Sequence, residues 1–323
     1  MCRHRPHWTV FLLVLACVLS GCGRDADESA LAGPELNKIT VGVLPIVDSA
    51  SLYLAMRNGY FAEEGLEVEV KTLAGGAAAV PGLRNDEVQF ALGNYVSFFA
   101  AQAAGALDVK LVADAYQASP GTFMIMVSRD SPMRKARDLA GKKIAVNTRA
   151  NVVELTARSA LQTAGVDPDT VTFVPIPFPE MTAALVGGAV DAAVMVEPYI
   201  TQAQKDHGVL PMIDVMSGPT AQFPIAAWVA TAKLATEKPN TVHAFQRAII
   251  KGQAAAANNR VEVERVLTEF VKVDTITVSL MQLGTWPTTL EETRIQRVVD
   301  LMTSAGQLPK PIDVHSMIIP PPA

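Results

Sequence analysis

Three polar segments of the sequence lie where a strand pattern gives way to a helix pattern, and their side chains are candidates for ligand binding. Small polar side chains at a helix start cap its first turn, and the free backbone N–H groups there favour sulfonate, carboxylate or phosphate. Plain capping would use the same residue types. The candidates are Asp48, Ser49 and Ser51, then Asn94 and Tyr95, and then Asn147, Arg149 and Asn151.

Two charged residues predict opposite ligand charges. Arg149 could bind an anion through bidentate hydrogen bonds, or it could be a solvated loop residue. Glu197 could bind an amine or a ring N–H, or it could accept backbone N–H groups at a hinge. Tyr199 could stack on a flat ligand. The two charges could also pair with each other or bind a zwitterion. We lean toward an anion, because several helix starts add to Arg149.

Glycine and aromatic residues give weaker signals. The pair Gly75-Gly76 follows a strand pattern and by itself indicates only a turn. Tyr95, Tyr116 and Trp228 could line a cleft or could belong to the core, where most aromatic residues lie. We retain Tyr95 and Trp228 as candidate ligand contacts.

Residues for catalysis or metal binding are sparse. His207, His243 and His315 are far apart and lack a metal-ligand spacing such as HxxxH. The sequence has no phosphate loop and no GxGxxG after a strand. We therefore expect no catalytic residue, no metal and no cofactor.

From Lys38 onward, strand patterns alternate with helix patterns. Such alternation predicts an α/β fold with a mostly parallel sheet and helices on both faces. After Pro239 we expect mainly helices and then an irregular tail over 309–323. The strands are predicted over 39–44, 66–73, 88–92, 109–115, 123–128, 143–147, 171–176, 192–196, 209–214 and 223–231.

Segments 83–92 and 185–194 match each other as a helix end, a tight turn and a buried strand. Any protein with βαβ units can produce one such match. Two similar lobes would also produce it, each presenting the carboxyl end of this strand to a shared cleft. Ligands bind at those ends in open parallel sheets.

The beginning of the sequence predicts export and anchoring. A short basic region precedes the apolar run 8–19, which has the length of a signal-peptide core and is too short for a membrane span. Residues 19–22, Leu-Ser-Gly-Cys, resemble the bacterial lipobox, which implies cleavage of residues 1–21 and a lipid on Cys22. The alternative is an ordinary secretory signal with an incidental cysteine.

Cysteine usage and charge narrow the class. The mature chain would keep only Cys22, so it would have no internal disulfide and would depend on burial for stability. Without residues 1–21 it has 25 basic and 32 acidic residues, which argues against nucleic acid or anionic lipid as a partner. Residues 23–37 are polar and acidic, and we predict a flexible tether over 22–37.

Five ordered segments of the sequence resemble one protein family. The segments are GYFAEEGLEVEV (59–70), GG (75–76), DEVQFALGNY (86–95), DLAGKKIAVN (138–147) and ALVGGAVDAAVMVEPY (184–199). They resemble the family of binding proteins for sulfonates, nitrate, taurine and thiamine pyrimidines, which have the periplasmic-binding-protein type 2 fold. The resemblance covers roughly residues 39–300.

The resemblance implies two lobes with a ligand cleft between them. Lobe one would comprise 38–121 and 231–323, and lobe two 122–230. Chain crossings near 119–126 and 223–231 would form a hinge that closes on the ligand. The family also has a glycine turn near the ligand, which would include Gly76, and a small Gly-Ser pair where this chain has Arg149.

The resemblance also implies a function. The chain would be a monomeric lipoprotein of the cell envelope that delivers a small organic solute to an ABC permease and its ATPase. The solute would be sulfonate-, nitrate- or taurine-like, or a thiamine precursor. A lipid-anchored sensor and an extracytoplasmic enzyme of the same fold are the alternatives. The related thiamine-pyrimidine synthase carries a cysteine-rich motif that this sequence lacks.

Overall fold

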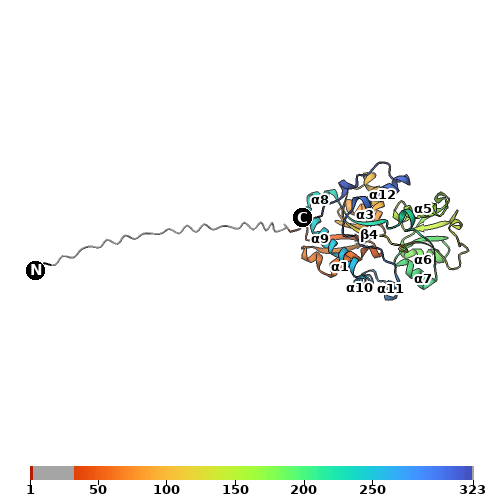
Figure 1. The fold of residues 1–323 in the computed structure, drawn as a ribbon, viewed down its shortest axis with the longest axis horizontal. Coiled ribbons are helices and arrows are strands. Elements are labelled where there is room, and N and C mark those ends of the chain that lie inside the picture. The colour runs from red at the N-terminus through yellow and green to blue at the C-terminus, as the bar shows by residue number, and fades with distance from the viewer. Residues whose placement is uncertain (3–32, 322–323) are drawn as a thin grey trace. The chain divides into compact units, whose positions relative to one another are not determined.

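The computed structural model describes residues 1–2 and 33–321, and the fold concerns the compact unit Gly33–Ala323 (Figure 1). The lipobox, Cys22 and all but two residues of the predicted signal peptide lie outside the described residues. Within the described part of the chain, no helix is both long and apolar enough to span a bilayer.

The first sheet has five strands in the order β2-β1-β3-β10-β4. Strand β1 pairs in parallel with β2 and β3, whereas β10 pairs antiparallel with both β3 and β4. The strands are β1 (Lys38–Val43), β2 (Glu67–Thr72), β3 (Phe90–Asn94), β4 (Val109–Gln117) and β10 (Pro224–Thr231). We call the part of the chain built on this sheet lobe one.

The second sheet repeats this plan in the order β7-β6-β8-β5-β9. Strand β6 is parallel to β7 and β8, and β5 is antiparallel to β8 and β9. The strands are β5 (Phe123–Val127), β6 (Lys143–Val146), β7 (Thr172–Pro175), β8 (Ala192–Val196) and β9 (Leu210–Asp214). This part is lobe two, and the α/β two-lobe fold predicted from the sequence is confirmed.

Each sheet contains one strand that runs against the other four, so the sheets are mixed, and most of their strands are parallel as predicted. The reason for the one reversed strand is the short connection between lobes. Residues 118–122 lead from the end of β4 directly into β5, and residues 215–223 lead from β9 into β10. A chain that crosses in so few residues enters the next sheet at the edge that faces the other lobe. Strands β5 and β10 therefore begin at the cleft and run away from it, whereas the other strands of each sheet run toward it.

Strand β10 corrects one predicted boundary. The sequence places 223–231 at the return crossing and assigns 122–230 to lobe two, but β10 pairs with β3 and β4 in the first sheet. The crossing therefore precedes Pro224. We propose lobe two as residues 123–214 with the two short connections as the hinge.

The matching segments 83–92 and 185–194 occupy equivalent places in the two lobes. Helix α3 (Gly76–Arg84) leads into β3, and α6 (Phe178–Val186) leads into β8. Both strands are third in the order of their sheets. The turns also agree, because Asp86 and Gly188 both have positive φ angles, +57° and +74°.

The core of lobe one depends on helices from both ends of the chain. Helix α9 (Pro239–Asn258) crosses α1 (Ala50–Arg57) so closely that a Cβ at Gly252 would lie 2.2 Å from the Ser51 carbonyl oxygen. The Phe245 ring of α9 stacks on Phe90, with ring centroids 3.9 Å apart. Figure 1 shows α1, α3 and α9 on the lobe that carries β4, and α5 (Val152–Thr163), α6 and α7 (Tyr199–His207) on the other lobe.

Some helices escape the sequence patterns because they are short or mainly polar. The sequence predicts no helix at α2 (Tyr60–Glu63), α7 (Tyr199–His207) or α8 (Ala232–Glu237). Within the predicted tail, the chain forms α13 and Ile318 pairs with Leu111 of β4. The remaining helices are α4 (Tyr95–Ala103), α5 (Val152–Thr163), α10 (Arg260–Val266), a π-helical turn (Leu267–Val271), α11 (Thr275–Leu280), α12 (Glu292–Ser304) and α13 (Val314–Met317).

The folded unit begins before Lys38. Glu35, which the sequence places in the tether, caps helix α9: its carboxylate accepts hydrogen bonds from the Asn240 and Thr241 backbone N–H groups and from the Thr241 hydroxyl. The Leu36 N–H also donates to the Thr241 hydroxyl. Residues 33–37 are therefore part of the fold, and any tether ends before Gly33.

Candidate ligand-binding site

The carboxyl ends of strands from both lobes border a small cavity, which we call the inner chamber. Its volume is about 30 Å³, room for about two water molecules. Much of its wall follows β1, β3, β6 and β8, where open parallel sheets bind ligands. The wall comprises Leu44, Ile46, Asp48, Leu92, Gly93, Asn94, Ile225 and Ala226 of lobe one and Phe123, Asn147, Asn151, Val152, Val153, Phe178 and Val196 of lobe two.

A second, larger cavity of about 340 Å³ lies against the first. We call it the outer chamber. It shares Leu44, Ile46 and Phe178 with the inner chamber, and it also receives residues from both lobes. The rest of its wall is Pro45, Thr72, Leu73 and Ala74 of lobe one and Pro177, Pro179, Glu180 and Tyr199 of lobe two.

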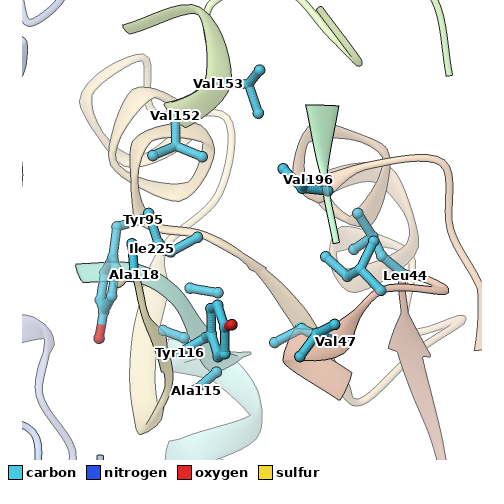
Figure 2. Packing of buried hydrophobic residues seen from close by; sticks show 14 of the residues in the cluster. Leu44, Val47, Tyr95, Ala115, Tyr116, Ala118, Val152, Val153, Val196 and Ile225 are labelled. Carbon is cyan, nitrogen blue, oxygen red and sulfur yellow. The ribbon is translucent and has the colours of Figure 1, made fainter. Parts of the chain in front are cut away.

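Apolar side chains form most of the inner wall. Figure 2 shows part of it, with Leu44 and Ile225 from lobe one and Val152, Val153 and Val196 from lobe two. The four polar side chains in this wall are Asp48, Asn94, Asn147 and Asn151. Four of the predicted site residues are thus brought together at one cavity.

Asp48 is the one ionisable side chain in the inner wall. It lies in a turn of 3-10 helix before α1 and is 6% exposed. Burial raises its pKa to about 7, and within the described residues only its own backbone N–H opposes that effect. A carboxylate buried without a cation is costly unless a ligand supplies a partner.

Asn94 links the starts of two helices from different lobes. Its side-chain oxygen accepts a hydrogen bond from the Ser97 N–H of α4 at 2.9 Å and another from the Val152 N–H of α5 at 3.3 Å. Gly76 packs against Asn94, and a Cβ there would lie 2.9 Å from the Asn94 side-chain nitrogen. Gly76 therefore lies beside a residue of the chamber wall but lines neither chamber itself, and only glycine leaves room for Asn94.

Asn147 and Asn151 form the matching pair in lobe two. The Asn151 side-chain oxygen caps α5 by accepting the Glu154 N–H at 3.1 Å. Its side-chain nitrogen donates to the Asn147 side-chain oxygen. Both asparagines are buried in the inner wall. Asn151 therefore caps α5 and also lines the inner chamber.

Arg149 lies outside both chambers. Its guanidinium donates to the two Glu154 carboxylate oxygens at 2.8 and 3.0 Å and to the Phe173 carbonyl oxygen at 3.1 Å. Burial opposes ionisation of Glu154, but these bonds, the Ala150 N–H and Arg158 outweigh it and lower the Glu154 pKa. The arginine is thus committed to a neighbouring carboxylate, which does not support the expected anion contact.

Glu197 is also occupied by the protein. Its carboxylate accepts hydrogen bonds from the Thr201 N–H and hydroxyl and from the Gln282 N–H at 3.1 Å. Gln282 belongs to the segment whose Thr285 pairs with Gln117 beside the first crossing. Glu197 therefore ties lobe two to the hinge region, which is the structural alternative considered from the sequence.

Tyr199 lies in the wall of the outer chamber. Its ring stacks on Phe178 of α6, with centroids 5.8 Å apart and planes 15° apart. Its hydroxyl donates to the Pro45 carbonyl oxygen of lobe one at 3.3 Å. Tyr199 therefore lies at the cleft as predicted, in an aromatic pair that a flat ligand could extend.

The remaining candidates lie in the core and line neither chamber. Tyr95 and Trp228 are 0% exposed, because β10 and the start of α4 lie in the interior of lobe one. Figure 2 shows Tyr95 among buried apolar side chains. The Ser49 hydroxyl donates to the Ile46 carbonyl oxygen, and Ser51 is buried where α9 crosses α1. These residues support the wall without reaching it.

Most of the apolar wall was missed from the sequence. Leu44, Val152 and Val196 each directly follow or end a strand or begin a helix, as the polar candidates do. Position at a strand end could have identified these residues. They were missed because the candidate site residues were chosen mainly for their polarity. Among the described residues, no group of His, Cys, Asp and Glu is arranged to bind a metal ion.

A family model described as NMT1/THI5 like matches residues 46–263, which include lobe two, much of lobe one and every chamber residue except Leu44 and Pro45. The chain belongs to this family. The match spans more than half of the chain and confirms the resemblance found in the sequence.

Individual relatives agree with this assignment. Riboflavin-binding protein RibY of Chloroflexus aurantiacus is 28% identical over 280 residues, or 81% of this chain and 76% of that protein. The alkanesulfonate-binding protein SsuA from Xanthomonas axonopodis pv. citri, bound to MOPS, superposes with a TM-score of 0.74 at 18% identity, covering 88% of this chain and 99% of that one.

The periplasmic nitrate-binding protein NrtA from Synechocystis PCC 6803 superposes with a TM-score of 0.72 at 16% identity, covering 88% of this chain and 86% of that one. At these identities the structural likeness shows the fold alone. The fold is that of periplasmic binding proteins, and the relatives are named as binding proteins for chemically different solutes.

Proposed function

We propose that this protein is an extracytoplasmic solute-binding lipoprotein that carries a small organic molecule to an ABC importer and is held to the membrane through Cys22. The observation that supports it most directly is the pair of chambers lined by both lobes. A ligand that touches both lobes stabilises the closed arrangement, and an importer can distinguish that arrangement from an open one.

The lobes are closed on each other in this structure. The Asn94–Val152 and Tyr199–Pro45 hydrogen bonds cross the cleft, and a Cβ at Gly75 would lie 3.2 Å from the Thr148 methyl group. A solute larger than a few waters cannot enter the inner chamber in this state. Binding therefore requires opening at the two short connections between the lobes.

The sizes of the two chambers suggest which part of a ligand each chamber holds. The inner chamber has room only for a small head group, and the outer chamber has room for an organic body beside Phe178 and Tyr199. Proteins similar to this chain in sequence or fold are named for binding sulfonates, nitrate and riboflavin. We propose a solute with a compact polar head and an apolar or aromatic body.

A ligand screen tests the function. Full-length protein in detergent is heated with alkyl sulfonates, nitrate, riboflavin and a thiamine pyrimidine, and hits are measured by calorimetry. A closed-form ligand at a hundredfold excess over Kd stabilises by about 2.7 kcal/mol, which raises Tm measurably. Hits should also reduce the radius of gyration in solution scattering. If no solute stabilises the protein and none changes its radius of gyration, the carrier function is rejected.

A further inference from the structure

We propose that Asp48 is the polar anchor for the ligand and that the site accepts a solute whose head group carries N–H donors, such as a protonated amine, and rejects anionic head groups. This assignment rests on the function proposed above and names the chemical class of the solute. It reverses the preference for an anion that the sequence suggests.

The charges in the cleft exclude an anion. Asp48 is the ionisable group of the inner wall, Glu180 lies in the outer wall, and no lysine, arginine or histidine of the described chain lines either chamber. Arg149, the expected cation, is bound by Glu154 and the Phe173 carbonyl oxygen. An anionic head would share a small, mostly apolar cavity with a carboxyl group and gain no side-chain countercharge.

The helix starts do not compensate for this. Helices α4 and α5 both begin at the inner chamber, and a free helix N-terminus would attract an anion. Here the Asn94 oxygen already accepts the Ser97 and Val152 N–H groups, and the Asn151 oxygen accepts the Glu154 N–H. The protein's own amide oxygens therefore occupy three of the N–H groups at these helix starts, which weakens their attraction for an anion.

The Asp48 carboxylate has no side-chain hydrogen-bond donor among the described residues, although Asp48 is 6% exposed and lies in the wall of the chamber. A buried acceptor with unused lone pairs needs a donor from elsewhere. An ammonium or amino group has the size of the space beside it, because the chamber volume is about 30 Å³.

Three matched compounds test the assignment. Benzylamine, benzyl alcohol and phenylmethanesulfonate share one ring and differ in head-group charge. Each is titrated calorimetrically into the full-length protein in detergent at about pH 8, where an exposed amine is still largely protonated. The variants are Asp48→Asn, which keeps the shape, and Glu237→Gln, which removes one negative charge from an exposed residue that lines neither chamber and serves as the matched control.

We expect benzylamine to bind more tightly than benzyl alcohol and the sulfonate not to bind. Asp48→Asn should weaken benzylamine about tenfold or more, because charge-assisted hydrogen bonds contribute about 1.5–3 kcal/mol. Glu237→Gln should change it less than about threefold, since Glu237 is exposed and lies outside both chambers. The Asn variant should remain folded, because it removes a buried charge, and a thermal melt verifies this.

Three results would overturn the assignment: sulfonate binding tighter than amine binding, benzylamine binding unchanged by Asp48→Asn, or no benzylamine binding at about 10 mM. Tight sulfonate binding that also closes the lobes would leave the carrier function intact and reject only the role of Asp48. Failure of every solute in the broader screen would instead reject the carrier function itself.

Discussion

At the scale of single residues, the partners of a charge decide its role. Arg149 and Glu197 look like ligand contacts in the sequence, but each is held by groups of the protein. Asp48 looks like a capping residue, but no side-chain cap hydrogen bond forms at that helix start. The residue without an internal partner is the one left to meet a ligand.

Asp48 should make stability depend on pH. Its folded-state pKa of about 7 lies above the unfolded value of 3.8, so between these pH values the folded protein holds a proton that the unfolded chain has released. The free energy of unfolding should therefore fall as pH rises through this window. In wild type this decrease in the free energy of unfolding should be on the order of 2–4 kcal/mol, and Asp48→Asn should abolish it.

Urea unfolding of both proteins at about pH 5 and pH 8 measures this. Asp114, with a pKa raised to about 6 by burial despite Arg294, and Glu197, with a pKa raised by burial, contribute with the same sign in both proteins. Tyr116 is the titratable neighbour whose pKa Asp48 raises. Equal pH dependence of wild type and variant would contradict the burial of an ionisable Asp48.

Arg149→Ala should affect stability and leave ligand affinity nearly unchanged. The arginine is half exposed and pairs with the buried Glu154, so its loss should lower the free energy of unfolding by about 1 kcal/mol. Calorimetry with the ligand found in the screen and urea unfolding separate the two effects. A loss of affinity of tenfold or more with unchanged stability would show that Arg149 reaches the ligand.

At the scale of helices and strands, the starts of α4 and α5 control closure. Asn94→Ala removes a cap of α4 and a bond to α5 of the other lobe, whereas Asn151→Ala removes a cap within lobe two only. Each loss of a cap should cost about 1 kcal/mol. Only Asn94→Ala should raise the ligand-free radius of gyration, because only that variant weakens the contact between lobes.

Solution scattering and thermal melts of the two variants measure these effects. An equal radius of gyration in both, with equal losses of Tm, would mean that the Asn94–Val152 bond does not hold the lobes together.

The strands lie close to where the sequence predicts them: strand β8 matches its predicted range, and the others differ by a few residues at their ends. Helix α7 was missed because its exposed face is mostly polar.

At the scale of the whole molecule, we predict that the carrier is held to the membrane through Cys22. We expect Cys22→Ala to prevent lipidation, because the lipobox resemblance makes this thiol the acceptor. Phase partitioning in a cloud-point detergent should move the variant from the detergent phase to the aqueous phase. Cys17→Ala is the matched control and should partition like wild type, since Cys17 precedes the predicted cleavage point. Equal partitioning of all three proteins would reject the lipobox.

The sequence alone determined the features that depend on neighbours along the chain. Alternating strand and helix patterns gave the α/β class, and the match of 83–92 with 185–194 gave the repeated lobe, because periodicity and turns are local. The caps at Asn94 and Asn151 were found for the same reason. Their side chains bond to backbone groups three residues away, so the pattern is visible in sequence.

Only the tertiary structure decided the direction of β5 and β10 and the charge of the cleft. Strand direction depends on the side from which a crossing chain enters a sheet. Glu197 meets Gln282, which is distant in sequence, and Asp48 lies in a chamber wall to which both lobes contribute. Burial and pairing of a charge are set by such distant neighbours. A single sequence therefore shows which residues could bind a ligand, and the fold selects which of them is free to do so.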